Sequence, residues 1–250
     1  MSEERVALVT GANKGIGQQI AKDLVGHGFT VLVGSRRLEA GEAAAKAMGA
    51  KAHAIQLDVT DAASIAAAAE RIRKEFGRLD VLVNNAGIVG EFVPGTSFAE
   101  RMKYNTPSSA PMNSIRTVFE TNVFGVIAVT QAMLPLLREA PAGRIVNVGS
   151  SVGSLGLASN PDHPYRPIFG AAYSPSKTAL NAVTLAFSIE LEKTNIKVNV
   201  VCPGYVATDL NDHQGHRTVE QGARQAVKMA LIGPDGPTGT YTDEDGTIPW

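Results

Sequence analysis

A tyrosine and a lysine stand four residues apart in AAYSPSKTAL, the stretch that covers residues 171–180. Four residues make about one helical turn, so Tyr173 and Lys177 would share one face of a helix. A phenol ordinarily has a pKa of about 10, and a neighbouring ammonium group lowers that pKa because it favours the tyrosinate. The pair therefore has the groups needed to give a proton to a carbonyl oxygen. The same spacing is commonplace on helix surfaces, so it does not identify a site by itself.

Pro175 lies between these two residues and would break the interior of a helix. In the first turn of a helix a proline is tolerated, because the N–H that it lacks has no intrahelical partner there. We therefore predict a helix that begins near residues 172–174 and continues through LNAVTLAFSIEL. Tyr173 and Lys177 would then lie at the start of this helix.

A glycine-rich segment, TGANKGIG at residues 10–17, joins an apolar run to a helical pattern. Gly11 permits a tight turn, Gly15 lets the backbone approach a pyrophosphate, and Gly17 permits close packing of the helix on the strand. The start of the helix offers amide donors and the positive end of its dipole to a phosphate. The segment predicts a nucleotide site, although a tight turn alone would also need glycines.

The second apolar run ends in GSRR, residues 34–37. Folds that prefer NAD usually carry an acidic residue here for the ribose 2′-hydroxyl. This chain has Ser35 and Arg36 instead, with Lys14 expected nearby in the glycine-rich segment. Two cations without a carboxylate favour a 2′-phosphate, so we expect the cofactor to be NADPH. The alternative is that these are solvated surface cations.

Two further motifs follow strand candidates. In LDVT, Asp58 would either accept a hydrogen bond from the adenine amino group or cap the next helix. In NNAG, Asn84 and Asn85 would bond loop backbone, and Gly87 would pass close to a ligand; the same four residues could form only a structural turn.

These motifs lie at the ends of apolar runs that alternate with helical patterns. Such nearly continuous apolar runs predict a parallel sheet covered on both faces. We predict an α/β, doubly wound Rossmann fold that forms a single domain over residues 1–250, with ligands at the carboxyl ends of the strands. The expected strands are 5–10, 30–35, 52–59, 79–87, 143–150 and 196–204, and the expected helices are 16–28, 38–49, 60–77, 113–138 and the one from Tyr173. The expected substrate loops are 88–112, 151–171 and 203–222.

Composition narrows the function classes. Of 250 residues, 44% are hydrophobic and 19% charged, and the net charge of −1 gives no basic field for nucleic acid or an anionic membrane. No apolar run approaches the ~18 residues of a membrane span. The single cysteine, Cys202, excludes an internal disulfide, and the first residues lack the pattern of a signal peptide, so we expect a cytoplasmic protein. His213 and His216 have no carboxylate–histidine constellation nearby, so no metal site is expected.

Five motifs occur in a fixed order along nearly the whole chain: TGANKGIG, NNAG, NVGSS, YSPSK and CPGYVATDL. Their order and positions resemble those of the short-chain dehydrogenase/reductase family, in its compact single-domain branch. GANKGIG and the ending TYTDEDGTIPW are similar to NADPH-dependent carbonyl reductases. The resemblance implies hydride transfer between NADPH/NADP+ and the carbonyl group of a small aldehyde or ketone.

The resemblance also implies four catalytic residues. Tyr173 and Lys177 match the YxxxK motif, and Asn122 in FETNVFG matches the asparagine of the long central helix. A gap-free match of VNVGSSVG to VNxSSxxG places the catalytic serine at Ser150, with Ser151 as the alternative. Tyr173 would donate the proton, Ser150 would orient the carbonyl, and Lys177 would hold the nicotinamide ribose. Asn122 would hold a water that connects Lys177 to solvent.

CPGYVATDL matches the PGxxxT segment of the family, in which Pro203 and Gly204 turn the chain beneath the nicotinamide. Thr208 would then bond the carboxamide or a cofactor phosphate. The residues expected to bind NADPH are Gly11, Asn13, Lys14, Gly15, Ile16, Gly17, Ser35, Arg36, Asp58, Val59, Asn85, Ala86, Gly87, Tyr173, Lys177, Pro203, Gly204, Val206 and Thr208.

The substrate is expected to be apolar or aromatic. The three loops offer Phe92, Val93, Leu155, Tyr165, Phe169, Tyr205 and Leu210 as walls, while Arg101 and Arg166 cannot be placed from the sequence. Loop 88–112 and the insertion NPDHPYRPIFG before Tyr173 are longer than is usual in the family. In some carbonyl reductases such an insertion covers a dimer face, so both a monomer and a homodimer remain open.

Two other functions fit the same motifs. One is the oxidation of a secondary alcohol with NADP+, which is the reverse reaction at the same site. The other is a non-enzymatic NADPH-binding sensor, for which four complete catalytic motifs would be unnecessary.

Overall fold

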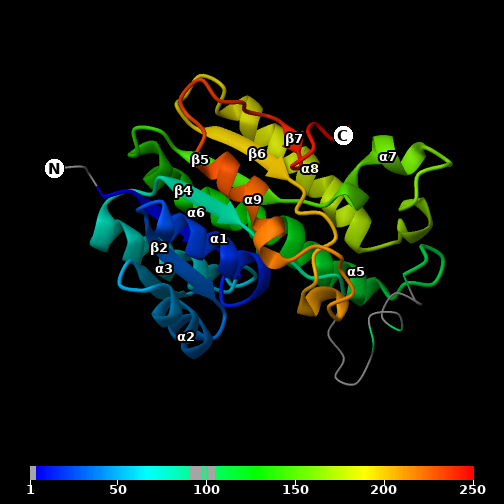
Figure 1. The fold of residues 1–250 in the computed structure, drawn as a ribbon, viewed down its shortest axis with the longest axis horizontal. Coiled ribbons are helices and arrows are strands. Elements are labelled where there is room, and N and C mark those ends of the chain that lie inside the picture. Colours follow the sequence, from blue (N-terminus) through cyan, green and yellow to red (C-terminus); the bar gives the residue numbers. More distant parts are fainter. Residues whose placement is uncertain (1–3, 91–96, 98–99, 101–104) are drawn as a thin grey trace.

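Seven parallel strands form one sheet in the computed structural model, which describes residues 4–90, 97, 100 and 105–250 (Figure 1). The strand order is β3-β2-β1-β4-β5-β6-β7, so the order reverses between β1 and β4. The strands are β1 (Val6–Val9), β2 (Thr30–Ser35), β3 (Ala52–Gln56), β4 (Val81–Asn84), β5 (Arg144–Val148), β6 (Lys197–Val201) and β7 (Tyr241–Thr242). The predicted doubly wound α/β fold is confirmed.

Helices cover both faces of the sheet (Figure 1). The α-helices are α1 (Gly15–Gly26), α2 (Leu38–Met48), α3 (Ala62–Phe76), α5 (Met112–Phe119), α6 (Gly125–Arg138), α7 (Leu155–Ser159), α8 (Tyr173–Glu190) and α9 (Val219–Ala230). A π-helical segment, η1 (Glu120–Phe124), joins α5 to α6, and three 3₁₀ turns are η2 (Ser151–Gly153), η3 (Arg166–Ile168) and η4 (Asp209–Asn211).

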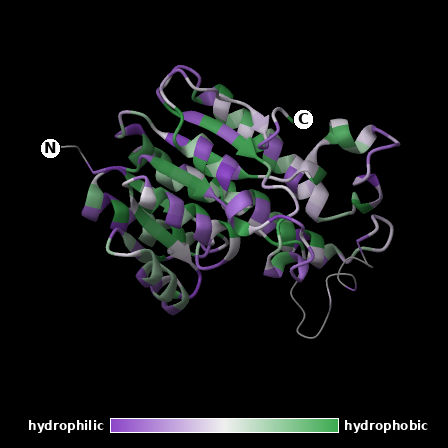
Figure 2. Cartoon of the chain, in the orientation of Figure 1, coloured by the Kyte–Doolittle hydropathy of each residue, from purple (hydrophilic) through white to green (hydrophobic). Residues whose placement is uncertain are grey.

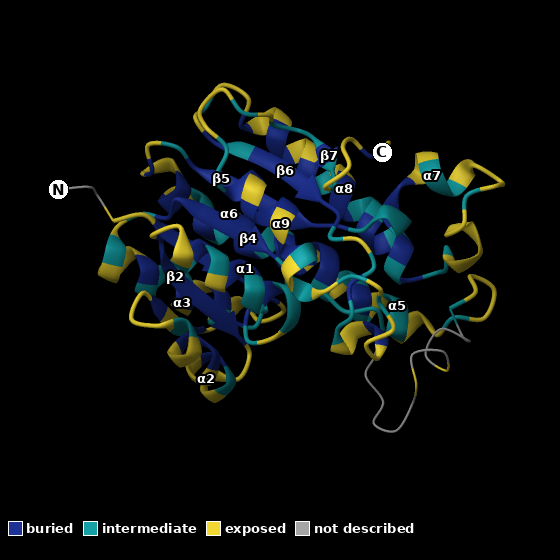
Figure 3. Cartoon of the chain, viewed as in Figure 1, coloured by how far each residue is buried: buried dark blue, intermediate teal, exposed yellow. Residues whose placement is uncertain are grey.

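Two apolar layers lie on opposite faces of the sheet, because successive residues of a strand point to opposite sides. Along β1, Val9 packs in the layer of α1 and α9, whereas Leu8 packs in the layer of α3, α6 and α8. The strands are correspondingly apolar in Figure 2 and buried in Figure 3. The sheet is therefore rigid, and the polar residues that follow its strands are held at one edge.

Local sequence signals set the helix boundaries. The Asp61 side chain caps α3 by accepting a hydrogen bond of 2.9 Å from the Ala63 N–H, and Gly77 ends this helix with φ of 74°. Helix α8 begins at Tyr173 with Pro175 in its first turn, so the predicted start is confirmed. The first residue of α8 is therefore the candidate proton donor.

Other parts of the chain differ from the prediction. The helix expected over 113–138 is interrupted by η1, and residues 219–222 of the expected loop 203–222 already belong to α9. The two-residue strand β7 and helix α9 were not anticipated. Helix 112–138 is long and apolar enough to cross a membrane by length and composition, but its Val129 and Met133 are buried in the layer on the sheet, as in a core helix.

Buried amide and hydroxyl groups connect β4, β5, α6 and α8 beneath the carboxyl edge of the sheet. Asn84 donates to the Asn147 Oδ1 at 2.8 Å and to the Thr130 hydroxyl at 3.2 Å. Asn147 in turn donates to the Thr184 hydroxyl at 2.8 Å. All four side chains are buried, so each would be costly to leave without a partner. The network holds the ends of β4 and β5 against α8.

We predict that Asn147→Ala lowers the free energy of unfolding by about 1–3 kcal/mol, because it removes one hydrogen-bond partner from the buried Asn84 amide and one from the buried Thr184 hydroxyl. Urea denaturation measures this change. The matched control is Asn113→Ala on exposed α5, for which we expect a change within about 0.5 kcal/mol. Equal effects of the two substitutions would contradict a stabilising role for the network.

Candidate active site

The Lys177 ammonium group lies at the carboxyl end of β5, where its Nζ donates to the Val148 carbonyl at 2.8 Å. Lys177 is only 4% exposed, and its Nζ is 5.7 Å from the centre of the Tyr173 ring. Gly87 lies on the other side, because a Cβ there would be 3.5 Å from Nζ. The expected pairing of Tyr173 with Lys177 on one face of α8 is therefore present.

Burial controls the ionisation of both groups. Burial lowers the pKa of Lys177 to about 8, because the charged form loses its hydration. It also raises the pKa of Tyr173 to about 12, while a hydrogen bond with the Ser150 side chain acts in the opposite direction. The lowered tyrosine pKa that we expected from the nearby ammonium is therefore not found in this structure. The loss of hydration outweighs it, although Tyr173 keeps part of its surface in solvent.

The two serines that follow β5 point to different partners. The Ser150 side chain lies beside Tyr173 and acts to lower the pKa of this tyrosine, whereas the Ser151 side chain acts in the same way on the buried Cys202. The Ser151 N–H also donates to the Cys202 Sγ at 3.1 Å. Of the two, Ser150 is therefore placed to share a carbonyl oxygen with Tyr173.

Asn122 is fully buried in the π-helical segment η1. Its side chain accepts from the Ile88 N–H at 2.9 Å and donates to the Ile88 carbonyl at 2.8 Å and to the Ser176 hydroxyl at 3.0 Å. Asn122 thus ties the chain after β4 to α8. These bonds show a positioning role, whereas the water-holding role implied by the family resemblance stays a prediction.

The glycine-rich segment has the geometry that a dinucleotide phosphate requires. Gly11 and Gly15 have φ of 62° and 58°, the left-handed region that favours glycine. A Cβ on Gly17 would meet the Asn85 Nδ2 at 2.3 Å, and Asn85 itself donates to the Thr10 and Gly11 carbonyls. No side chain caps the start of α1, so its first amides can face an anion. The described residues therefore fit a bound pyrophosphate.

The segment that follows β6 lies next to the glycine-rich turn. Gly204 has φ of 77°, as expected for a turn at Pro203–Gly204. The Thr208 methyl group would lie 3.6 Å from a Cβ on Gly15. Lys14 pairs with Asp209 at 2.6 Å, so this lysine bridges the two segments. Asp209 has a lowered pKa, chiefly because of its hydrogen bond with Lys14.

The ends of β2 and β3 carry the residues expected at the adenosine part of the cofactor. Arg36 is exposed, and no ion pair between described residues involves it. The Ser35 hydroxyl is already used, because it donates to the Arg37 carbonyl at 2.9 Å. The Asp58 carboxylate accepts from the Thr60 N–H at 2.9 Å and from its hydroxyl at 2.7 Å, so a local turn occupies one oxygen of this residue, while Asp61 and not Asp58 caps α3.

The remaining candidates lie close to these groups. Ala86 packs on Gly11, and the Val59 carbonyl packs on the start of α6. Val206 is buried and forms an isolated bridge with Arg217. Asn13 and Ile16 are partly buried in the turn and the first turn of α1.

The residues expected to form the substrate walls differ in exposure, and their role stays a prediction. Leu155, Tyr165 and Leu210 are exposed, whereas Phe169 and Tyr205 are partly buried. Phe92, Val93 and Arg101 lie outside the described residues. Arg166 donates to the Ala158 and Ser159 carbonyls and so closes the loop that contains α7.

Sequence reasoning missed Tyr241, Asn181 and Asp209. Tyr241 and Asn181 contact the turn that carries Ser150, and Asp209 pairs with Lys14. Asn181 had a detectable signal, because it continues the spacing of Tyr173 and Lys177 by another four residues on α8. Tyr241 and Asp209 had no such signal, because their contacts join segments that are distant in the sequence.

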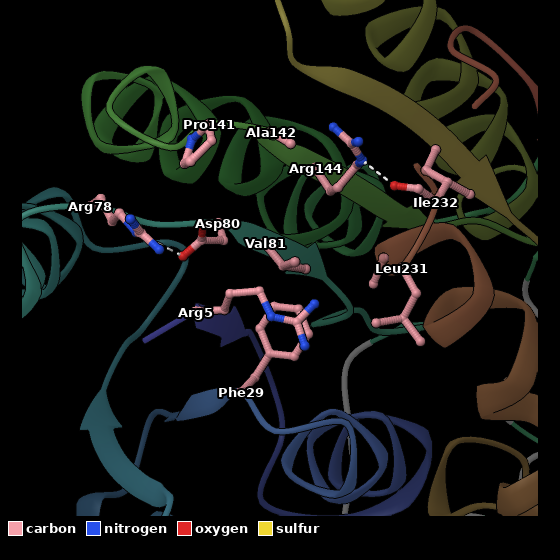
Figure 4. A pocket seen from close by; sticks show the side chains of 11 residues that line it. Arg5, Phe29, Arg78, Asp80, Val81, Pro141, Ala142, Arg144, Leu231 and Ile232 are labelled. Carbon is pink, nitrogen blue, oxygen red and sulfur yellow. Dashed lines mark hydrogen bonds and ion pairs between the residues drawn. The ribbon is translucent and has the colours of Figure 1, made fainter. Parts of the chain in front are cut away.

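A cavity of about 310 Å³ lies at the opposite edge of the sheet (Figure 4). Arg5, Phe29 and Asp80 precede strands, and Arg144 begins β5, so the cavity is at the amino ends. Arg144 is buried and donates to the Ile232 carbonyl at 2.9 Å and the Asn195 carbonyl at 3.1 Å. Its bonds thus join loops that follow α8 and α9, away from the candidate active site.

Comparisons with known proteins agree with this geometry. A family model described as short chain dehydrogenase matches residues 5–218. A short-chain dehydrogenase of Penicillium roqueforti, named anuI, is 36% identical over 97% of this chain and 95% of its own length. Salutaridine reductase of Papaver somniferum is 33% identical over 97% of this chain and 95% of its own length.

Solved structures show the same similarity. The structure of that salutaridine reductase superposes with a TM-score of 0.81 and 32% identity, covering 96% of this chain and 100% of that chain. A short-chain dehydrogenase from Shigella flexneri, described as complexed with NADP, gives a TM-score of 0.80 and 26% identity over 96% of this chain and 97% of its own. With the glycine-rich turn, the Tyr173–Lys177 pair and the parallel sheet in place, the chain belongs to the short-chain dehydrogenase family and is an oxidoreductase acting on CH–OH groups.

Proposed function

We propose that this protein is an NADPH-dependent carbonyl reductase. The observation that carries the proposal is the placement of the Ser150 side chain beside the Tyr173 phenol, next to the buried ammonium of Lys177 and at the same edge of the sheet as the glycine-rich turn. The two hydroxyl groups can bind one carbonyl oxygen together. The adjacent turn fits the cofactor that would supply the hydride.

The residues of the chain would orient the substrate and move one proton. NADPH, when bound, supplies the hydride. Ser150 donates a hydrogen bond to the substrate carbonyl, and Tyr173 gives its proton to the same oxygen as negative charge develops there. The positive charge of Lys177 stabilises the tyrosinate that remains. Tyr173 then regains a proton from solvent, toward which it is partly exposed.

NADPH is favoured over NADH by the charge at the end of β2. Arg36 is exposed and unpaired among the described residues, so a 2′-phosphate would gain a charge-assisted hydrogen bond from it. Lys14 is a weaker candidate for this role because Asp209 already partly neutralises it. The similarity to a protein described as complexed with NADP is consistent with this choice.

An apolar carbonyl compound is the proposed substrate class. Exposed apolar side chains follow strands at this edge of the sheet, at Leu155 after β5 and Leu210 after β6. The described parts of these segments contain Arg166 and Arg217, and both already donate hydrogen bonds to nearby backbone carbonyls. They are therefore not free to bind an anionic substrate group. The related protein of Papaver somniferum is, by its name, a salutaridine reductase, so a carbonyl reduction is consistent with the family.

The ionisation of Tyr173 favours reduction over the reverse oxidation. Reduction needs the protonated phenol, and a pKa of about 12 keeps Tyr173 protonated near neutral pH. Alcohol oxidation needs the tyrosinate, which the same burial disfavours. For this reason we propose reduction as the main direction, with alcohol oxidation as the second candidate.

We predict that Tyr173→Phe lowers kcat for carbonyl reduction at least ~100-fold, because the proton donor is lost. A panel of apolar aldehydes and ketones with NADPH absorbance provides the measurement, and fluorescence titration checks that NADPH still binds. Tyr165→Phe is the matched control, because that exposed ring also loses only a hydroxyl. Turnover that survives in Tyr173→Phe would refute the proton-donor role, and an inactive native protein would favour the sensor hypothesis.

Arg36→Ala is expected to lower the ratio of kcat/KM for NADPH to that for NADH about tenfold or more, because one charge-assisted bond contributes about 1.5–3 kcal/mol. Arg37→Ala makes the same change of charge at the next exposed position and should leave the ratio within about twofold. A native preference for NADH, or an equal effect of the two substitutions, would contradict the assignment of Arg36.

The pH dependence follows from Lys177. Since the pKa of Lys177 is lowered to about 8, the ammonium form is lost as the pH rises through this value, and kcat/KM for NADPH should fall there. Tyr173 stays protonated over the same range. In Lys177→Arg the rate is expected to be lower, but the decline near pH 8 should disappear because a guanidinium stays charged. An unchanged decline in this variant would assign it to another group.

A further inference from the structure

Tyr241 reaches the candidate active site from the far end of the chain. Its hydroxyl donates to the backbone carbonyl of Ser150 at 2.5 Å, across 91 residues of sequence. The side chain is 1% exposed and packs in a small apolar cluster with Val200, Cys202 and Ile248. The bond therefore lies in a dry environment, where it competes little with water.

The turn that carries Ser150 is held at several other points by side chains. The Gly153 carbonyl accepts from the Thr178 hydroxyl at 2.8 Å and from the Asn181 amide at 3.3 Å, both on α8. The Cys202 Sγ accepts from the N–H of Ser151. A Cβ on Gly153 would meet the Cβ of Lys177 at 2.7 Å, so the turn packs directly on the catalytic helix. The peptide between Ser150 and Ser151 is held by this Ser151 N–H, by the Gly153 N–H, which donates to the Ser150 carbonyl at 2.8 Å, and by the Tyr241 hydroxyl. Tyr241 supplies the side-chain donor to that carbonyl.

The last ten residues hold Tyr241 in place and contact the same loop. We call residues 241–250 the carboxyl-terminal segment, which lies beside β6 and α8 in Figure 1. Within it, the Trp250 ring lies 5.6 Å from the Tyr241 ring. The Trp250 carbonyl accepts from the Gly156 N–H at 2.8 Å, and the Pro249 carbonyl accepts from the Ser154 hydroxyl. The segment thus fixes the loop just beyond the Ser150 turn.

The position of the Ser150 hydroxyl depends on the orientation of its own peptide. The Ser150 carbonyl accepts from two donors, the Gly153 N–H and the Tyr241 hydroxyl, and loss of one of them lets the attached Cα and side chain shift. A shift of ~1 Å at a reacting group can cost on the order of 100-fold in rate. Burial raises the pKa of Tyr241 far above its usual value, so its hydroxyl remains a donor at all working pH values. The restraint on Ser150 is therefore permanent.

We propose that Tyr241 is a positioning residue that fixes the Ser150 hydroxyl against Tyr173 by holding the Ser150 carbonyl. This inference rests on the proposed reductase function, because it assigns Ser150 to the carbonyl oxygen. Tyr241 does not contact the reacting atoms and acts only through Ser150. The carboxyl-terminal segment is accordingly part of the machinery that orients the substrate.

If Tyr241 only stabilised the fold, its substitution would affect kcat in the same way with and without Ser150. Comparing the two backgrounds therefore separates a structural role from a positioning role. Tyr241→Phe removes one hydroxyl and keeps the ring that packs on Trp250. We expect kcat to fall about tenfold with KM for NADPH within about twofold of the native value. In a Ser150→Ala background the same substitution should change kcat less than about twofold, since the hydroxyl that it positions is absent.

Thr240→Val is the matched control. It also removes a hydroxyl beside β7, but the lost bond goes to Asn199 at 2.8 Å and not to Ser150. We expect its kcat to lie within about twofold of the native value in both backgrounds. If Tyr241→Phe lowers kcat equally with and without Ser150, or if Thr240→Val has the same effect, the positioning role is overturned.

A second measurement needs no turnover and so separates failure of this inference from failure of the proposed function. The ¹³Cζ chemical shift of Tyr173, assigned with Tyr173→Phe, reports how the Ser150 side chain interacts with the Tyr173 phenol. Tyr241→Phe and Ser150→Ala should shift this signal in the same direction, and the double variant should add no further shift. An unmoved signal in Tyr241→Phe would overturn the inference even in a protein without reductase activity.

Discussion

A buried ammonium group is the constraint on which the candidate active site depends. Lys177 is 4% exposed, its ammonium group donates to the neutral Val148 carbonyl, and no carboxylate of the described residues pairs with it. Burial of an unpaired charge is costly, and the lowered pKa of Lys177 expresses this cost. The surrounding structure must therefore hold the Lys177 ammonium group in place, and several neighbouring residues do so.

The neighbours of Lys177 illustrate this requirement. Gly153 after β5 leaves room for the side chain, because a Cβ there would lie 2.7 Å from the Lys177 Cβ, and Gly87 after β4 lies within contact distance of the ammonium group. Asn122 in the π-helical segment ties the chain after Gly87 to α8. Parallel strands bring these separate segments to one edge, where Tyr173 lies in the first turn of the same helix as Lys177. The candidate proton donor and the buried ammonium group therefore both lie at the start of α8.

Local signals in the sequence were sufficient for much of this arrangement. Pro175 indicated where α8 begins, the apolar runs indicated a parallel sheet, and Gly11 and Gly15 indicated a turn with left-handed residues. Each of these features depends on a few adjacent residues, whose conformational preferences act without the rest of the chain.

Features that depend on distant segments were not predictable in the same way. The bond from Tyr241 to Ser150 joins a two-residue strand to a turn 91 residues earlier, and no periodic pattern marks it. The direction of the Tyr173 pKa shift was also wrong, because the sequence shows the neighbouring charge but not the loss of hydration. The π-helical segment at Asn122 is a departure from regular helix that apolar periodicity does not reveal.

The most direct test of this account is the ionisation of Lys177 itself. Lysine side chains labelled with ¹³C at Cε can be titrated by NMR in the native protein, and Lys177→Met identifies the signal of Lys177. We expect a pKa of about 8 for this group. A pKa near the ordinary value of about 10.4 would show that the ammonium is not desolvated, and it would contradict the central role given to its burial.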